Sequence, residues 1–338
     1  MARKLRVDKV IQVMSRRTFI LGIASGLAML SFTCIAQTQD KVWRIGMLET
    51  TSPTLNAANL DAFRQRLREL GYVEGRNLII EYRSSDGRGE RFPGLASELI
   101  AKGVDLIVAG GSTATKAAKS ATGSIPVVMA ASGDPLLFVS SLSHPGGNIT
   151  GVSSVAVDLE TKRLGLLREL LPGMTRVAVL YNLTNPTIPS IWKEVETAAR
   201  SVGVGPELFD VRKADDLEAA FIAASRQRID GVVVGSDGFF RTNRQLIAEL
   251  AAKHRLPAIY RSMEFIEAGG LIAYGPNYHE LYRQAANYVD KIFKGAKPGD
   301  LPIEQPAKFE LIINLKAAKA MGLTIPQSLL LRADEVIR

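Results

Sequence analysis

Short apolar runs alternate with amphipathic stretches along most of the chain. The run 43–48 is typical of a strand that is buried on both faces, and apolar side chains then recur at helical spacing from Leu60 until Gly71. The same alternation continues to residue 152 with short connections. It predicts further strands at 77–82, 105–109, 125–130 and 148–152, and helices near 91–102 and 112–121.

A second series of helices and strands begins at Asp158, a residue that suits a helix N-cap. Strict alternation with short connections favours right-handed crossovers between parallel strands. Two runs of four or five such units predict an α/β protein with two lobes rather than one very wide sheet. The second series is expected to have strands at 176–181, 207–211, 231–235 and 257–260, with helices near 187–202, 215–227 and 241–254.

The remaining segment holds too little regular structure for a third lobe. Because about sixty residues with one long helix and one strand cannot bury a core of their own, we expect them to complete the two lobes. The chain would then cross between the lobes more than once. The segment predicts an extended stretch at 269–275, a helix from Asn277 to Gly295, a strand at 309–314 and a short helix at 315–321. The expected lobes are 42–153 plus 276–300, and 154–275 plus 301–338.

The N-terminus has the pattern of an export signal. Six basic side chains precede a short apolar run at 19–30, and small residues follow it. The stretch 15–20 resembles the twin-arginine motif, which addresses a chain to a translocon that accepts folded cargo. We therefore expect residues 1–36 to be a signal peptide cleaved after Ala36, and the mature protein to be periplasmic. Lipoprotein anchoring at Cys34 is the alternative, although Phe32 and Thr33 fit a lipobox poorly.

Most of the net positive charge of the chain lies in this predicted signal. The formal net charge is +8, but residues 1–36 carry six basic residues and one acidic residue, so about +3 remains. A modest excess of this size gives no support for nucleic-acid binding. The single cysteine, Cys34, lies in the signal, so the mature chain has no disulfide and no multi-cysteine metal site.

No sequence motif supports catalysis, a metal or a cofactor. The three histidines His144, His254 and His279 lack the spacing of a metalloprotease helix, and neither a nucleophile elbow nor a phosphate-binding loop occurs. The stretch 110–113 follows a predicted strand and opens a helix, so it could hold an anion, but it lacks the dinucleotide-binding spacing. We expect no catalytic residue, no metal ligand and no cofactor.

Small polar side chains follow the predicted strands in both lobes. Ligands of open parallel sheets lie beyond the carboxyl ends of the strands, and short hydroxyl, amide and carboxylate groups suit a small polar solute. Taken singly, each of these residues has an alternative structural role as a helix N-cap or a turn, and Tyr274 as a core aromatic residue. Groups at the strand ends also include Glu49, Thr50, Gly133 and Arg261. The predicted ligand contacts are Thr51, Ser52, Ser112, Thr113, Ser132, Asp134, Asn182, Asn185, Ser236, Asp237 and Tyr274.

Several stretches resemble the type I periplasmic substrate-binding proteins of ABC transporters, in the group that contains tryptophan- and tyrosine-binding members. The resemblance covers essentially the whole mature chain and keeps the order of the glycine-rich motifs. It implies two Rossmann-like lobes with parallel sheets, a hinge of several crossings, and docking of the closed form on a membrane permease. The stretches that carry it are 70–77, 132–135, 144–152, 267–276 and 308–316.

The solute does not follow from this resemblance. The stretch 49–53 departs from the pattern of the aromatic-amino-acid binders, although 269–275 resembles it. An amino acid or related small carboxylate is the working hypothesis. In it Ser112 and Thr113 hold the carboxylate, and Asp134 or Asp237 holds an amine.

The leading hypothesis is an exported, monomeric solute receptor without catalytic activity. Its partners would be a small-molecule solute and an ABC permease in the inner membrane, and not nucleic acid. Two alternatives remain open: a ligand sensor that signals to a membrane receptor, and an exported enzyme on the same scaffold. A repressor is disfavoured because an export signal stands where a helix-turn-helix would be.

Overall fold

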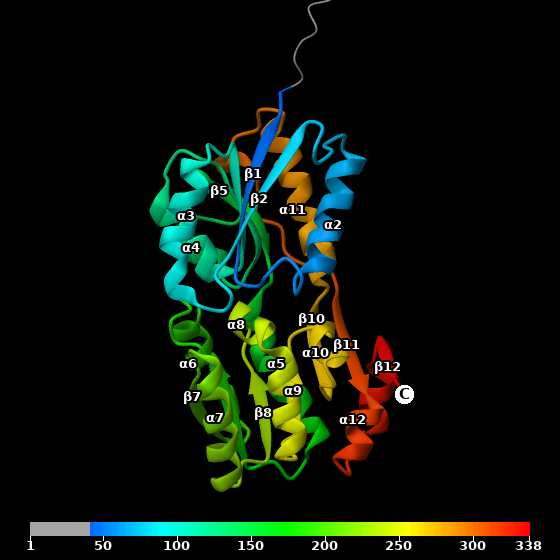
Figure 1. Cartoon of the computed structure of the whole chain (residues 1–338). Helices are drawn as coiled ribbons and strands as arrows, with labels where there is room; N and C mark the ends of the chain where they lie inside the picture. Colours follow the sequence, from blue (N-terminus) through cyan, green and yellow to red (C-terminus); the bar gives the residue numbers. More distant parts are fainter. Residues whose placement is uncertain (1–40) are drawn as a thin grey trace, which may run out of the picture. The chain divides into compact units, whose positions relative to one another are not determined.

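The computed structural model describes residues 41–338, and the stretch from Val42 onward forms one compact unit built on two β-sheets (Figure 1). The predicted export signal and Cys34 lie outside the described residues. Within 41–338, no helix is both long and apolar enough to cross a membrane.

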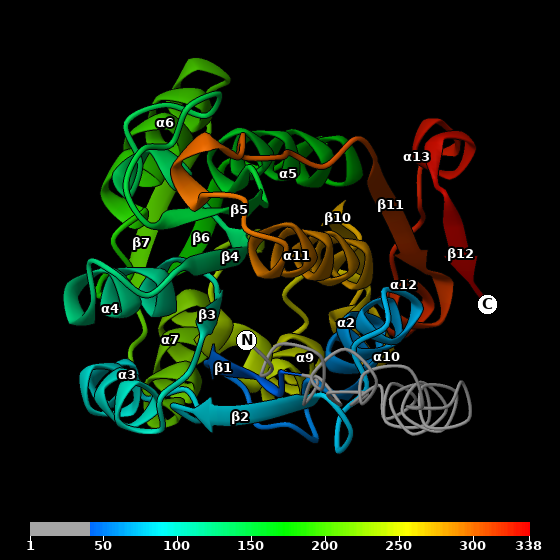
Figure 2. The same cartoon turned by 90° about the horizontal axis from the view of Figure 1, so that it is seen from above.

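The first sheet has five parallel strands in the order β2-β1-β3-β4-β5. Its strands β1, β3, β4 and β5 are largely buried because helices cover both faces, whereas the edge strand β2 is only half-buried. Helices α3 and α4 pack on one face, and α2 and α11 pack on the other (Figure 2). We call this sheet with its four helices the first lobe. Its elements are β1 Trp43–Glu49, α2 Ala57–Glu69, β2 Leu78–Ser84, η1 Gly89–Arg91, α3 Phe92–Ala101, β3 Leu106–Gly110, α4 Ser112–Ala121, β4 Val127–Ser132, η2 Pro135–Leu137, β5 Ile149–Ser153, α11 Tyr278–Phe293 and η3 Pro298–Asp300.

The second sheet has seven strands in the order β12-β11-β10-β9-β8-β6-β7. Helices α5, α6, α12 and α13 bury one face, and α7 to α10 bury the other. We call this sheet with its helices the second lobe. Its elements are α5 Ala156–Leu170, β6 Arg176–Tyr181, α6 Ile188–Ser201, β7 Gly205–Asp210, α7 Ala214–Arg226, β8 Gly231–Val234, α8 Gly238–Thr242, α9 Arg244–Lys253, β9 Ala258–Tyr260, α10 Met263–Glu267, β10 Ile272–Pro276, β11 Phe309–Asn314, α12 Leu315–Ala320, α13 Gln327–Arg332 and β12 Glu335–Ile337.

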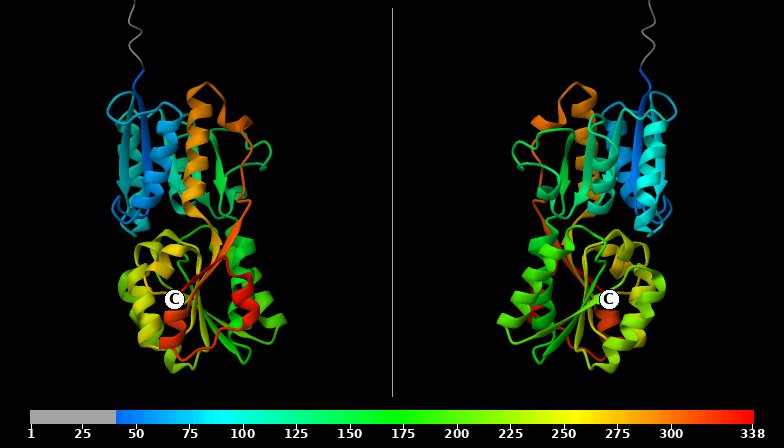
Figure 3. Two further views of the ribbon diagram at one scale, coloured as in Figure 1. Left: turned by 90° about the vertical axis from the view of Figure 1, so that its right-hand side faces the viewer. Right: turned by 90° about the vertical axis from the view of Figure 1, so that its left-hand side faces the viewer.

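Three connections join the lobes, and they can be followed in Figure 3. The chain leaves the first sheet after β5, returns to it from β10 through Asn277 into α11, and leaves it again before β11. Each lobe is therefore built from separate parts of the sequence.

The strand predictions are confirmed in both series, and the predicted long helix after Asn277 is α11. Two details differ. Helix α5 begins at Ala156, after Val155 in the left-handed region at φ 44°, so Asp158 lies in the first turn and is not the N-cap. The predicted helix 241–254 is two helices, α8 and α9.

One strand breaks the parallel pattern. β11 pairs antiparallel with β10 because it enters the second sheet directly from the first lobe, without a crossover helix. Three short elements at the edges of the second lobe, α10, α13 and β12, were not predicted because each is too short to show a period.

Candidate functional site

The carboxyl ends of both sheets meet at a narrow pocket between the lobes, which we call the interlobe cradle. Loops that follow β1, β3, β4 and β5 supply one wall, and loops that follow β6, β8 and β9 supply the other. The cradle has only about 20 Å³ of free volume, which is room for about one water molecule. Its lining residues are Thr50, Gly110, Gly111, Ser112, Thr113, Ala131, Gly133, Ser154, Asn185, Ser236, Asp237, Gly238 and Arg261.

On the first-lobe side, the end of β3 turns sharply into α4. Gly110 lies so close to Glu49 that an added Cβ would come within 2.1 Å of the carboxylate, and Gly111 has φ +90°. Ser112 then opens α4, and its hydroxyl accepts a hydrogen bond from the Gly133 backbone N–H at 2.9 Å. The amino end of a ten-residue helix thus borders the cradle, where its dipole favours an anion.

On the second-lobe side, Asp237 is held in a fixed position. One of its carboxylate oxygens accepts from the Phe239 N–H at 2.7 Å and the other accepts from the Asn185 amide at 2.6 Å. Burial raises the pKa of Asp237, against the opposing effect of these hydrogen bonds.

Arg261 brings a positive charge to the same pocket. The residue directly follows β9 and is only 7% exposed, and its guanidinium carbon lies 4.2 Å from the centre of the Tyr278 ring. Within 41–338, no group accepts a hydrogen bond from its buried Nε. Against the effect of burial, the positive charge of Arg261 also acts to lower the pKa of Asp237 and of Glu264, so the guanidinium has carboxylates near it. Its unused Nε donor suits a further acceptor such as a carboxylate, because a buried donor without a hydrogen bond costs free energy.

A buried ion pair on α5 holds the second-lobe wall of the cradle in place. Glu160 and Arg163 are both fully buried on α5, with 2.8 Å between their charged groups. The Glu160 carboxylate accepts from the Ser236 N–H at 2.9 Å, and Arg163 donates to the Ser236 hydroxyl at 2.8 Å and to the Tyr274 carbonyl at 2.9 Å. The pair fixes the loop after β8 relative to β10.

A second polar cluster joins the lobes beside the cradle. Arg241 of α8 donates to the Thr51 hydroxyl at 3.2 Å and lies 3.6 Å from the carboxylate of Glu49 at the end of β1. Tyr282 of α11 donates to the other oxygen of Glu49 at 2.7 Å. Burial raises the pKa of Glu49 to about 7, against the opposing effects of the Arg241 charge and the Tyr282 hydrogen bond.

Two further hydrogen bonds extend this cluster across the interface. The hydroxyls of Thr51 and Thr242 are 3.1 Å apart, and the Asn59 amide donates to Glu264 at 3.1 Å. In each pair one residue belongs to the first lobe and the other to the second. We call the six residues Glu49, Thr51, Asn59, Arg241, Thr242 and Glu264 the interlobe cluster.

A larger hollow of about 610 Å³ opens beside the cradle, and we call it the outer groove. Its walls come from η1, α3 and α4 of the first lobe and from the loops after β6 and β7 of the second. Thr113 lines both the cradle and the outer groove, so the two spaces adjoin.

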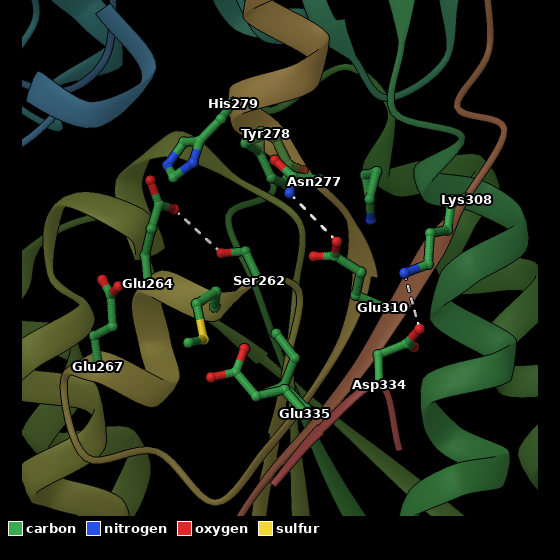
Figure 4. A pocket seen from close by; sticks show the side chains of 13 residues that line it. Ser262, Glu264, Glu267, Asn277, Tyr278, His279, Lys308, Glu310, Asp334 and Glu335 are labelled. Atoms are coloured by element: carbon green, nitrogen blue, oxygen red, sulfur yellow. Dashed lines mark hydrogen bonds and ion pairs between the residues drawn. The ribbon is translucent and has the colours of Figure 1, made fainter. Parts of the chain in front are cut away.

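A third hollow lies in the second lobe beside the β10–α11 connection, and it is rich in carboxylates (Figure 4). Several of these carboxylates already have partners: Glu264 accepts from Ser262 at 3.2 Å, and Lys308 lies 3.0 Å from Asp334. In the part of the chain that the structure describes, no group of three or more potential ligands could hold a metal ion.

Comparison with known proteins identifies the family. The sequence profile of the family described as ABC transporter substrate binding protein matches residues 49–337. This chain belongs to that family. The Tyrosine-binding protein of Clostridioides difficile (strain R20291) is 26% identical over 274 residues, which cover 80% of this chain and 78% of the relative.

Two solved structures are similar over most of this substrate-binding protein. A conserved domain protein from Vibrio cholerae has a TM-score of 0.82 at 25% identity and covers 88% of this chain and 100% of its own. The ABC domain from Streptococcus pneumonia in complex with L-Trp has a TM-score of 0.79 at 27% identity. The match covers 87% of this chain and 99% of the other. The expected family and the type I periplasmic-binding-protein fold are confirmed.

The structure of this substrate-binding protein brings six of the eleven predicted contact residues to the space between the lobes. Ser112, Thr113, Asn185, Ser236 and Asp237 line the cradle, and Asn182 lines the outer groove together with Thr113.

The other five predicted residues lie outside both spaces. Thr51 belongs to the interlobe cluster, and Ser52 accepts from the Leu55 N–H in its own turn. Ser132 lies behind the cradle, where its hydroxyl is 3.2 Å from that of Ser112 and its carbonyl accepts from the Ser154 N–H at 2.7 Å. Asp134 caps η2 by accepting from the Leu136 N–H, and the ring of Tyr274 packs against Phe309.

Three charged residues that shape this region are absent from the predicted ligand contacts. Arg261 was among the strand-end groups but not among the chosen contacts, and nothing in the sequence showed that its Nε would lack a partner. Arg163 lies on the apolar stripe of α5, and a charged residue at such a position is the signal that could have identified it. Arg241 gives no comparable signal, because its partners Glu49 and Thr51 are about 190 residues away.

Proposed function

We propose that this substrate-binding protein captures an amino acid or a related small carboxylate in the interlobe cradle and delivers it to an ABC importer. The observation that carries the proposal is Arg261, a buried arginine with an unpartnered Nε that lies in a pocket between two lobes. The relatives that bind tyrosine and L-Trp support the same class of solute.

The cradle offers complementary groups for the two charged ends of an amino acid. Arg261 and the amino end of α4, at Ser112 and Thr113, suit a carboxylate. Asp237 suits an ammonium group, and its buried position makes a charged partner valuable because the partner stabilises the ionised carboxylate. Asp134 is removed from the cradle, so we favour Asp237 of the two candidate acids.

The small free volume of the cradle requires that the lobes separate before a solute enters. We propose that the three connections between the lobes act as the hinge, with 42–153 plus 276–300 moving against 154–275 plus 301–338. A solute that contacts both lobes stabilises the closed form, because the open form offers it only half of these contacts. The closed form is then the one that docks on the permease.

The export route and the site of action belong to the same proposal. Substrate-binding proteins of this family are extracellular or periplasmic. We propose that residues 1–36 direct a monomeric protein to the periplasm through the twin-arginine route, and that it functions there without catalytic activity.

The proposal is tested by measuring solute binding to Arg261→Gln by calorimetry. We expect L-amino acids to bind the unaltered protein, and the substitution to weaken binding about tenfold to a hundredfold because a charge-assisted hydrogen bond contributes about 1.5–3 kcal/mol. Arg200→Gln is the matched control, because Arg200 pairs with Glu196 on the exposed face of α6 and lines neither the cradle nor the outer groove, so the affinity should not change. Equal affinity of Arg261→Gln and the unaltered protein would contradict the proposal.

A further inference from the structure

The outer groove adjoins the cradle at Thr113 and is lined by residues of both lobes. Ala117 of α4 and Pro93 of α3 lie on its first-lobe side, and Thr184 lies on its second-lobe side. An added Cβ on Gly89 would lie 3.9 Å from the Thr184 hydroxyl, so the two walls approach each other closely at one end. Separation of the lobes would therefore open the groove and the cradle together.

The volumes of the two spaces decide where the larger part of a solute can lie. The cradle has about 20 Å³ of free volume and the outer groove about 610 Å³. The cradle can close around the charged head of a solute, but a side chain of several heavy atoms needs more room than one water molecule occupies. The outer groove supplies that room next to Thr113, and its volume is typical of small-molecule pockets.

The lining of the outer groove indicates which chemistry it accepts. Pro93, Ala117 and Ala121 contribute apolar surface to its lining, and charged side chains such as Arg212 line it as well. Apolar lining stabilises an apolar group by removing it from water, and the polar side chains can accommodate a polar tip.

We propose that the outer groove is the subsite for the apolar side chain of the solute, and that Pro93 and Ala117 determine how large a side chain the protein accepts. This inference rests on the proposed function, because it assumes that the solute is anchored by its charged head at Arg261. It adds that solute selectivity is set mainly by α3 and α4 of the first lobe.

The test fills the groove and compares solutes of graded size. The variant is Ala117→Phe, and the probes are L-alanine, L-leucine, L-phenylalanine and L-tryptophan, measured by calorimetry. In the unaltered protein we expect affinity to rise with the apolar area of the side chain. In Ala117→Phe we expect affinity for the two aromatic probes to fall by about tenfold or more, while affinity for L-alanine changes by less than about twofold.

Two further variants serve as a control and as a replacement for Ala117→Phe. Ala320→Phe places the same ring on an exposed position of α12, and it should leave all four affinities unchanged. Ser97→Phe fills the groove from an exposed position of α3, so it replaces Ala117→Phe should the latter fail to fold.

The outcomes separate this inference from the proposed function. If Arg261→Gln weakens all probes and neither groove-filling variant changes the preference for large side chains, the subsite is overturned and the proposed function stands. If Arg261→Gln has no effect, the proposed function fails and the subsite fails with it. If none of the four amino acids binds, the subsite is overturned.

Discussion

Glu49 shows how a single buried carboxyl can link the lobes and respond to pH. One of its oxygens accepts from Tyr282 of its own lobe, and the other faces Arg241 of the opposite lobe without a hydrogen bond from any described residue. Burial raises the pKa of Glu49 to about 7, against a usual value of 4.5. The carboxyl of Glu49 therefore retains its proton more firmly in the folded protein than in the unfolded chain.

This proton gives a testable pH dependence of stability. Between about pH 4.5 and pH 7 the folded state holds more protons at Glu49 than the unfolded state, so this group makes stability fall as pH rises. Glu49→Gln removes the contribution. We expect the stability of the variant relative to the unaltered protein to rise across this window by up to about 3 kcal/mol, measured by chemical denaturation at several pH values.

The control for this prediction is a carboxyl with the opposite shift. A hydrogen bond from Lys253 lowers the pKa of the exposed Glu218. Glu218→Gln should therefore show no gain in relative stability as pH rises from 4.5 to 7. A flat difference between Glu49→Gln and the unaltered protein would show that Glu49 titrates normally.

At the scale of elements, β4 and β5 approach each other unusually closely at one glycine. Gly151 of β5 has φ +128°, and an added Cβ would lie 2.4 Å from the Met129 carbonyl oxygen of β4. The pairing of these strands is irregular between Met129 and Ser132, where β4 leads toward the cradle. The close approach therefore fixes the path of the chain just before a wall of the site.

Gly151→Ala should destabilise the protein by more than about 2 kcal/mol, because the clash is with backbone atoms that cannot move aside and the backbone conformation is strained for any other residue. Gly165→Ala is the matched control. Gly165 lies in the interior of α5 with no atom near its added Cβ, so the same change should stabilise by about 0.5–1 kcal/mol. The change in the free energy of unfolding is measured by chemical denaturation for both variants. Equal changes for Gly151→Ala and Gly165→Ala would contradict the predicted clash.

At the scale of the whole molecule, the interlobe cluster holds the two lobes together without lining the cradle. Its hydrogen bonds between Thr51 and Thr242, and between Asn59 and Glu264, join residues of different lobes. Such contacts exist only when the lobes are together, so they bias the equilibrium between open and closed forms.

Removal of one of these contacts should weaken solute binding at a distance. We expect Thr242→Val to lower affinity about twofold to tenfold, because a net hydrogen bond contributes about 0.5–1.5 kcal/mol to the form that binds. Small-angle scattering should show more of the open form at the same solute concentration. Thr161→Val, which removes a hydrogen bond within α5 alone, should change neither quantity.

The sequence predicted the fold well and identified some of the residues that line the cradle, for physical reasons. Strands buried on both faces and helices ended by glycine leave strong local patterns, so almost every long element was located. Ser112 and Asp237 could be found because strand ends converge in any parallel sheet. The antiparallel β11 and the contacts of Arg241 depend on how distant segments meet, and no local pattern encodes that.

The discontinuity of the two lobes has a consequence for how the protein matures. All five strands of the first sheet have been synthesised by residue 153, but one of its faces is covered by α11, which ends at Phe293. The second sheet likewise waits for β11 and β12, which end at Ile337. Neither lobe can therefore complete its core from the strands that are synthesised first, and each lobe waits for a segment that follows residue 277.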